Sequence, residues 1–549
     1  MKNNLMPKGI ILILFCSLFF VSCGSSERSN NIDSIEKYRE LRTEKLHKSR
    51  RVIHNNDGCD ALYFPVNEKY TVTNFLDKRS AGLIGTDVST ISFCPTASGF
   101  GNFTYNTQAG ELLVKHGFEF GLRDDTRNIT AEMIAEGTDP LKANVEFARD
   151  NGFEIFWSNR MNDTHDAAHR VDKPFYLWTK FKENNPQYLF GDVGERLPNG
   201  RWSSVDFTHQ EVRDRCVQFF KEVCENYDVD GVEMDFLRHF ELFKNVGRGG
   251  VASQEQLDML TDMVSQIRKV TEEAGMKRGN PILVLTRIPT SPEYAKRAGV
   301  DIERWIEEGL VDIVVGSCYF RLDFWQNFAE LGEKDNVKIY AGLSESRVRE
   351  EHPLLVRQQN SVFRARAAAA WEAGLDGMYS FNEYNSRVRY LCEIGYPEKL
   401  AKTNNLYFVT YRDYTASRYL KGGDDFFKMP RLSPTPGNHL KLNSGPFNFA
   451  MELGDESVQA DVYALVYADD INPGNLTVKV NNSEAEFKGK TEDGLYIFEV
   501  EQTAISRGIN ELYIEGGNLK NDPELKDAAL FFCRDKKDIE MRNLIAECK

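Results

Sequence analysis

Eight short apolar segments, each ending in polar side chains, recur between residues 50 and 383 of the chain. Segments whose apolar residues recur at helical spacing separate most of them, as at 208–227 and 362–374. Strands that alternate with helices indicate parallel β/α units, and eight such units match a closed (β/α)8 TIM barrel. The apolar segments lie at 50–57, 89–96, 153–160, 229–236, 281–288, 311–320, 336–345 and 375–383. We therefore predict an α/β fold, with the barrel spanning residues 50–429.

An open doubly wound sheet is the rival arrangement for the same alternation. It loses support because no G-x-G-x-x-G motif follows the first apolar segment. After residue 429 the pattern changes, beginning with the Pro-rich linker "MPRLSPTPGNH". Alternating segments rich in Val, Tyr and Phe follow it, split by Gly, Asn and Pro. This pattern is typical of a small all-β sandwich, which we place at residues 430–549 as an accessory domain.

The amino terminus has the features of an export signal. Two lysines precede an apolar run from Ile10 to Val21, which is shorter than the roughly 20 residues that span a bilayer. Its ending "FVSCG" resembles a bacterial lipobox with Cys23 as the lipidated residue. We predict a lipoprotein signal peptide at residues 1–23, and a polar tether with a leading helix at 24–49. Because no Asp follows Cys23, we expect a lipid anchor in the outer membrane, on its periplasmic face or at the cell surface.

The composition of the chain narrows the classes of molecule that it could bind. The formal net charge is −15, so the phosphates of nucleic acids would be repelled. The cysteines are scattered and form no C-x-x-C pair, which gives no zinc signature. Neutral substrates such as carbohydrates are not excluded by this charge. The oligomeric state stays open.

The stretch "DVDGVEMDFLRHF" at residues 228–240 places two acids in an apolar strand. Strand side chains alternate, so Glu233 and Asp235 face one side, which we take to be the barrel interior. Asp235 lies about 6.6 Å further toward the carboxyl-terminal rim, where barrel enzymes build their active sites. Glycoside hydrolysis needs two carboxyl groups. We predict Asp235 as nucleophile or base and Glu345 as acid, with Glu383 as the substitute acid.

Other polar or aromatic side chains cluster at the ends of the predicted strands. Trp157 is expected to offer an apolar face to a sugar ring, and Arg160 to bind hydroxyl, carboxylate or sulfate groups. Arg238 is expected to stabilise the Asp235 anion. The predicted substrate-binding residues are Asp57, Trp157, Asn159, Arg160, Asn162, Asp163, His165, Glu233, Arg238, His239, Arg287 and Tyr319.

A metal site is the alternative use of one part of this rim. Asp163, His165, Asp166 and His169 all carry ligating atoms, but they fall on a loop whose shape the sequence does not fix. We predict no metal and no cofactor, and keep a metal-dependent hydrolase on the same barrel as an alternative.

Several motifs together resemble a known family. The stretches "RRVIHNNDGCD", "EIFWSNRMNDTHD", "SSVDFTHQEVRDRCVQFFKEVCENYDVDGVEMDFLRHF" and "GLDGMYSFNEY" are similar to the glycosyl-hydrolase-like family ten barrel proteins of bacterial polysaccharide users. The resemblance covers about residues 50–420 and implies a (β/α)8 barrel and glycoside hydrolysis. "DGVEMDFL" also resembles the chitinase motif D-G-x-D-x-D-x-E. It departs from that motif at Glu233 and at Leu237, which stands where the catalytic Glu belongs.

These observations predict a glycoside hydrolase that acts on a poly- or oligosaccharide by paired-carboxylate catalysis at the barrel rim. A non-catalytic glycan-binding surface lipoprotein that uses the same rim is the second alternative.

Overall fold

The structure is a computed structural model. It describes residues 32–95, 99–113, 118–237, 239–317, 321–333, 337–344, 348, 356–413, 415–492, 494–517 and 519–536. Within these residues no helix combines the length and the apolar character needed to cross a membrane. The predicted signal peptide and Cys23 lie outside the described residues.

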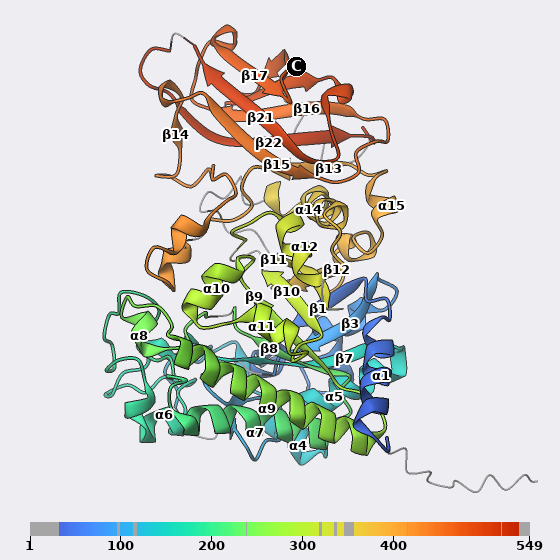
Figure 1. The fold of residues 1–549 in the computed structure, drawn as a ribbon, viewed down its shortest axis with the longest axis vertical. Helices are drawn as coiled ribbons and strands as arrows, with labels where there is room; N and C mark the ends of the chain where they lie inside the picture. Colours follow the sequence, from blue (N-terminus) through green and yellow to red (C-terminus); the bar gives the residue numbers. More distant parts are fainter. Residues whose placement is uncertain are drawn as a thin grey trace, which may run out of the picture.

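Eight parallel strands close into a barrel in the order β1-β12-β11-β10-β9-β8-β7-β3. Each of the eight apolar segments coincides with one of these strands, with β3 beginning one residue before its segment, so the predicted barrel is confirmed (Figure 1). The strands are β1 (Val52–Asn56), β3 (Val88–Phe93), β7 (Glu154–Arg160), β8 (Gly231–Asp235), β9 (Leu283–Ile288), β10 (Ile313–Ser317), β11 (Lys338–Ser344) and β12 (Gly377–Phe381).

Amphipathic helices cover the outside of the barrel. In α7, the residues Val212, Cys216 and Phe219 recur at helical spacing and are all fully buried. The helices of the barrel include α3 (Val72–Arg79), α5 (Pro140–Asn151), α7 (Gln210–Asn226), α9 (Gln254–Arg278), α10 (Pro292–Ala298), α11 (Ile302–Glu307), α12 (Trp325–Glu333) and α14 (Asn360–Glu372).

The amino-terminal end of the barrel is fastened to the leading helix. This helix, α1 (Ile35–Leu46), begins after Ser34, whose side chain accepts a hydrogen bond from the backbone of Lys37. The Lys45 ammonium lies 3.0 Å from a carboxylate oxygen of Asp230, just before β8. The predicted leading helix is therefore present, and it leaves the opposite, carboxyl-terminal end of the strands for the site.

Strand register shows which side chains face the barrel interior. Glu233 of β8 contacts Ser92 of β3 and Tyr379 of β12, which lie on other parts of the barrel wall, so it points inward. Arg160, Asp235 and Arg287 pair in register across β7, β8 and β9. Asp235 is two residues beyond Glu233, so alternation places all three on the inner face at the carboxyl-terminal end.

Two antiparallel sheets form the carboxyl-terminal sandwich, as predicted. One has the order β13-β22-β16-β20-β19, with β14 also paired to β22, and the other has the order β15-β21-β17-β18. The strands are β13 (Asn405–Phe408), β14 (Leu440–Lys441), β15 (Phe447–Leu453), β16 (Asp461–Ala468), β17 (Leu476–Val480), β18 (Ser483–Glu484), β19 (Glu486–Lys490), β20 (Leu495–Val500), β21 (Gly508–Gly516) and β22 (Glu524–Cys533).

The predicted domain boundary at residue 430 needs correction. β13 pairs antiparallel with β22, so the chain enters the sandwich before residue 410. It then returns to the barrel, where Tyr294 donates a hydrogen bond to the carbonyl of Ala416 at 2.8 Å. The chain therefore crosses between the domains more than once, and no single residue divides them.

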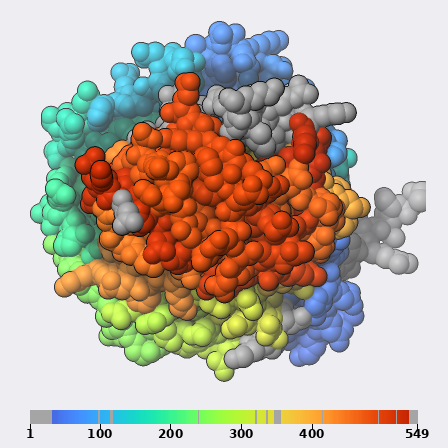
Figure 2. Space-filling view, turned by 90° about the horizontal axis from the view of Figure 1, so that it is seen from above, coloured from blue at the N-terminus to red at the C-terminus, as the bar shows by residue number. Residues whose placement is uncertain are grey.

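Helix α14 joins the two domains. Its Ala367 and Ala370 belong to the barrel core, while Ala365 and Ala369 belong to the sandwich core. A Cβ atom added at Gly454 of the sandwich would lie 2.4 Å from the Cβ of Ala368, so the backbones approach closely here. Figure 1 shows the sandwich packed over α14, and Figure 2, seen from above, shows the barrel extending around it on all sides.

Candidate active site

Asp235 ends β8 and is held as one half of a buried ion pair. Its Oδ2 accepts a hydrogen bond from Nη2 of Arg287 at 2.6 Å, and its Oδ1 accepts one from the backbone N–H of Leu237 at 2.9 Å. Asp235 is 3% exposed and Arg287 is 1% exposed. A buried acid needs a cationic partner and hydrogen bonds, and Arg287 and the backbone of Leu237 supply both to Asp235.

Glu233 lies deeper in the barrel and is tied to the same arginine. Its carboxyl group accepts hydrogen bonds from Ser92 and from the Tyr379 hydroxyl, the latter at 2.8 Å, and its Oε1 lies 3.8 Å from Nε of Arg287. Burial, reinforced by the negative charge of Asp235, raises the pKa of Glu233 to about 7. The two acids of one strand therefore differ in their surroundings: Asp235 binds Arg287 directly, whereas the carboxyl group of Glu233 is bound by the hydroxyl groups of Ser92 and Tyr379.

Arg287 has hydrogen-bonding capacity left over. Its Nε and Nη1 are buried and have no hydrogen-bond partner among the described residues. The guanidinium carbon lies 3.8 Å from the ring centroid of Phe381, which holds the group by a cation–π contact. Buried polar atoms without partners call for a water or a ligand, so the two nitrogens of Arg287 mark a place for one near Asp235.

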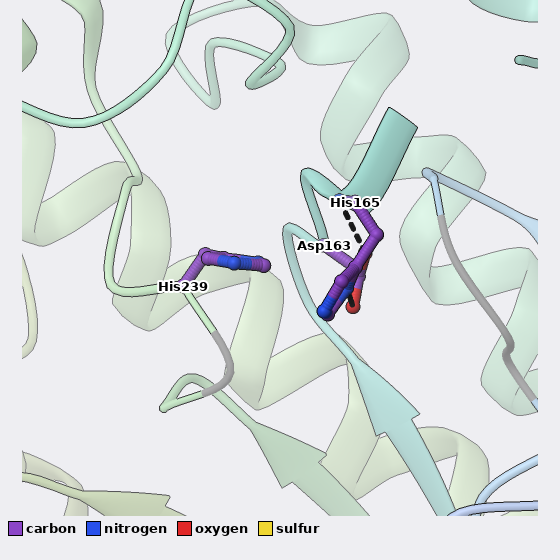
Figure 3. Close-up of side chains that lie close together, drawn as sticks. All are labelled: Asp163, His165 and His239. Atoms are coloured by element: carbon purple, nitrogen blue, oxygen red, sulfur yellow. Dashed lines mark hydrogen bonds and ion pairs between the residues drawn. The ribbon is translucent and has the colours of Figure 1, made fainter. Parts of the chain in front are cut away.

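A second polar cluster follows β7 at the same rim (Figure 3). Both carboxylate oxygens of Asp163 lie 2.8 Å from Nδ1 of His165, and Nη1 of Arg160 lies 3.3 Å from Oδ2. Burial of Asp163 opposes its ionisation, but His165, Arg160 and His239 outweigh it and hold the pKa of Asp163 well below its ordinary value. A carboxylate only accepts hydrogen bonds, so Nδ1 of His165 carries the proton. Nε2 is then the ring nitrogen that can give or accept a proton, as in Asp–His pairs that transfer protons.

Asp163, His165 and His239 are also the group of described residues that could hold a metal ion. Their ligating atoms lie within 4.8 Å of one another. However, Nδ1 of His239 accepts a hydrogen bond from the backbone N–H of Thr164 at 3.0 Å, and Nδ1 of His165 is bonded to Asp163. If Nε2 of a neutral His239 bound a metal ion, the ring proton would have to be on Nδ1. Nδ1 could then no longer accept the hydrogen bond from the N–H of Thr164. The hydrogen bond at Nδ1 of His239 therefore counts against a metal ion bound through its Nε2, whereas the Asp163–His165 pair fits either role.

The other two residues of the predicted metal alternative do not join this cluster. Asp166 forms a buried ion pair with Lys182, with 2.6 Å between the charged atoms. His169 stacks on Trp178, with ring centroids 4.1 Å apart. Both residues fasten the loop after β7.

Three of the predicted substrate-binding residues pack against the covering helices or hold loops together instead of facing the barrel interior. Trp157 is fully buried on the outer face of β7, edge-on to Phe220 of α7 at 5.0 Å between centroids, so it offers no face to a sugar. Asn159 shares that outer face by alternation and is buried. The amide of Asn162 bonds the backbone of Val205 in both directions, at 2.8 and 3.0 Å, and clamps two loops together.

Asp57 takes a supporting place at the rim. It follows β1 and accepts hydrogen bonds from Arg79 and from the backbone N–H of Cys59, and its Oδ2 lies 3.9 Å from Nη2 of Arg160. It therefore helps to position Arg160 from the side opposite Asp163.

Glu383, the predicted substitute acid, is turned to the outside of the barrel. Its Oε2 accepts a hydrogen bond from Tyr390 at 2.9 Å, and Tyr390 stacks on Phe363 of the covering helix α14. Asn382, which precedes it, has a φ of 56°, so the alternation of β12 ends there. Glu345, Arg238 and Tyr319 lie outside the described residues, and their roles stay predictions.

Ser92, Tyr379 and Phe381 were missed as part of the site. Each faces the interior and contacts Glu233 or Arg287. Alternation along "STISF" and "GMYSF" carries the signal that would have found them, because it places these residues on the inner faces of β3 and β12.

Comparison with known proteins gives a likeness of fold. No family model matches the chain, and no curated protein matches its sequence. The structure is similar to alpha-L-fucosidase isoenzyme 2 from Paenibacillus thiaminolyticus, with a TM-score of 0.40, 12% identity, and coverage of 64% of this chain and 49% of that chain. The chain thus spans about half the length of that fucosidase.

Two further solved structures are similar to the same degree. One is the PgaB (BpsB) glycoside hydrolase domain from Bordetella bronchiseptica, with a TM-score of 0.38, 10% identity, and coverage of 61% and 95%. The other is GH36 alpha-galactosidase AgaA from Geobacillus stearothermophilus, with a TM-score of 0.35, 9% identity, and coverage of 88% and 58%. Since one barrel fold hosts many chemistries, similarity at this level bears on the fold alone.

The raised pKa of Glu233 predicts how stability depends on pH. The folded chain keeps this proton up to about pH 7, while the ordinary pKa of a free glutamate side chain is 4.5. The folded state therefore binds more protons between these values, and raising the pH across them destabilises it, by up to about 3 kcal/mol. The Glu233→Gln variant should lack this loss. Denaturant unfolding of both proteins at pH 5 and pH 8 measures the difference, and parallel pH dependences would contradict the assigned shift.

Proposed function

We propose that the chain is a glycoside hydrolase whose reacting carboxylate is Asp235. The observation that carries the proposal is the ion pair between Asp235 and Arg287 above the partly protonated Glu233, at the carboxyl-terminal end of a closed barrel. Active sites of such barrels are built at this end. The resemblance to glycosyl-hydrolase-like family ten supports the same function.

Hydrolysis of a glycosidic bond requires an anion on one side of the bond and a proton donor on the other. Asp235 supplies the anion, either to attack the anomeric carbon or to activate water. Arg287 holds this carboxylate in place, and its Nε and Nη1 are available to sugar hydroxyls. The raised pKa of Glu233 favours its neutral form, which limits a second negative charge beneath Asp235.

The proton donor has two candidates, because the hydrogen bond of Glu383 to Tyr390 counts against Glu383. Glu345 directly follows β11 and keeps its predicted role as acid. His165 is the second candidate, because Asp163 orients its ring and β7 runs beside β8 in register, with Arg160 opposite Asp235. Either group would complete a pair with Asp235.

Replacement of Asp235 tests the proposal. A panel of polysaccharides first identifies a substrate by product release. On that substrate, Asp235→Ala should lower kcat by about 10²–10⁴-fold or more, because the reacting group is removed. Added azide or formate should restore part of the turnover, which a purely structural role of Asp235 would not allow.

The matched control is Asp376→Asn, which changes an acid at the opposite end of the barrel, where Asp376 pairs with Lys338. This variant should keep its activity. A folded Asp235→Ala protein with near-normal kcat would refute the proposal. Glycan binding without any product over long incubation would favour the non-catalytic lipoprotein instead.

The role of His165 has a separate readout. If it transfers the proton, His165→Gln should lower kcat by about 10²–10⁴-fold and remove one limb of the pH–rate profile. An unchanged profile would return the role of acid to Glu345. Activity that is lost on chelation and restored by Zn²⁺ would instead favour a metal at Asp163, His165 and His239.

We also propose that the chain is a lipoprotein of the outer membrane, anchored through Cys23. The lipobox-like sequence and the polar stretch after it support this location. Cells that express the full chain should incorporate labelled palmitate into it, and Cys23→Ala should abolish the label. Equal labelling of the two proteins would sink the assignment.

A further inference from the structure

A cavity of about 420 Å³ lies where the barrel meets the sandwich. This volume is within the range of roughly 300–1,000 Å³ that is usual for small-molecule sites. Three parts of the chain line it, namely the barrel elements around β10, β11 and α14, the segment 409–413 after β13, and the Pro-rich linker. The linker is therefore a wall of the cavity as well as a connection.

Positive charge is concentrated in this cavity. Four arginines line it, and Asp413 is the acid among its described lining residues. Two of these arginines also face acids that do not line the cavity, since Arg321 pairs with Glu452 and Arg431 lies 3.9 Å from Asp424. The excess of cationic groups is therefore one of the lining side chains, in a chain whose net charge is −15. The arginines are Arg321, Arg366, Arg412 and Arg431.

Aromatic rings and fixed contacts hold the guanidinium groups. Arg366 donates to the carbonyl of Ser344 at 2.7 Å, and its guanidinium carbon lies 5.3 Å from the ring centroid of Tyr411. The corresponding distance from Arg321 to Trp325 is 4.7 Å. Arg431 lies 4.5 Å from the ring centroid of Phe427. Groups that are ordered before binding lose less side-chain entropy when a ligand arrives.

We infer that this cavity binds an acidic sugar unit, one that carries a carboxylate or a sulfate group. Planar guanidinium groups match both anions by paired hydrogen bonds, and arginine is more weakly hydrated than lysine. Trp325, Leu343, Phe427 and Met429 add apolar surface to the same cavity, which suits the carbon face of a sugar ring.

The position of the cavity connects this ligand to the barrel rim. Arg366 binds the carbonyl of Ser344, the last residue of β11, and Arg321 lies shortly after β10. A polysaccharide chain bound at the rim would therefore extend toward the cavity from the ends of β10 and β11. In this form the inference rests on the proposed function and names its substrate class as an acidic glycan.

Direct binding tests the inference independently of catalysis. The probes are a digalacturonate, its neutral methyl ester and a sulfated disaccharide, each titrated calorimetrically into the full chain. At least one acidic probe should bind, and the methyl ester should bind at least about tenfold more weakly than digalacturonate if the carboxylate is the bound group. Binding of the digalacturonate indicates a carboxylate ligand, and binding of the sulfated disaccharide indicates a sulfate. If neither acidic probe binds, the inference is overturned.

Variants locate the binding. The double variant Arg412→Gln with Arg431→Gln should weaken the acidic probe about tenfold or more, whereas Lys421→Gln, an exposed cation outside the cavity lining, should leave it unchanged. A folded double variant with unchanged affinity would overturn the inference. Asp235→Asn should keep full affinity for the probe, so a failed hydrolase assignment and a failed binding site give different results.

Discussion

One buried arginine organises the interior of the barrel. Arg287 is fixed over Phe381, binds Asp235 directly and lies near Glu233, so one positive charge faces two acids of the same strand. Burial raises the pKa of Glu233, the negative charge of Asp235 adds to the shift, and Arg287 offsets it only in part. The raised pKa of Glu233 follows from burial and from the charge of Asp235. This pKa shift depends on the interior of the barrel and not on the residues next to either acid in the sequence.

The fold could be predicted from the sequence because each barrel strand is a compact apolar segment with a helix after it. Alternation also placed Glu233 and Asp235 on the same inner face, and the rise along β8, which ends at Asp235, puts Asp235 nearer the rim. The same rule, applied to β7, places Trp157 and Asn159 outside with the helices. Their proximity to Arg160 in the sequence made them look like rim residues, although adjacent strand residues face opposite ways.

Other parts of the site depend on geometry that no local pattern encodes. Glu383 follows a residue with positive φ, and this backbone turn sends its side chain to Tyr390 on the outer face. Asn162 looks like a sugar ligand in the sequence, yet distant backbone groups at Val205 occupy its amide. The prediction of a single boundary between the domains was wrong for a similar reason. β13 is only four residues long, and its partner β22 lies more than 100 residues later.

The alanine-rich helix α14 ties the sandwich to the barrel, so the sandwich is not an independent module. Different faces of α14 fill the two hydrophobic cores, so each core is complete only when this helix is in place between the domains. Loss of order in one core therefore removes packing from the other, and the two halves are coupled in a single cooperative unit. A domain attached in this way is not readily exchanged between proteins by recombination, as a binding module on a flexible tether can be. The sandwich has to be inherited and to fold together with the barrel that it covers.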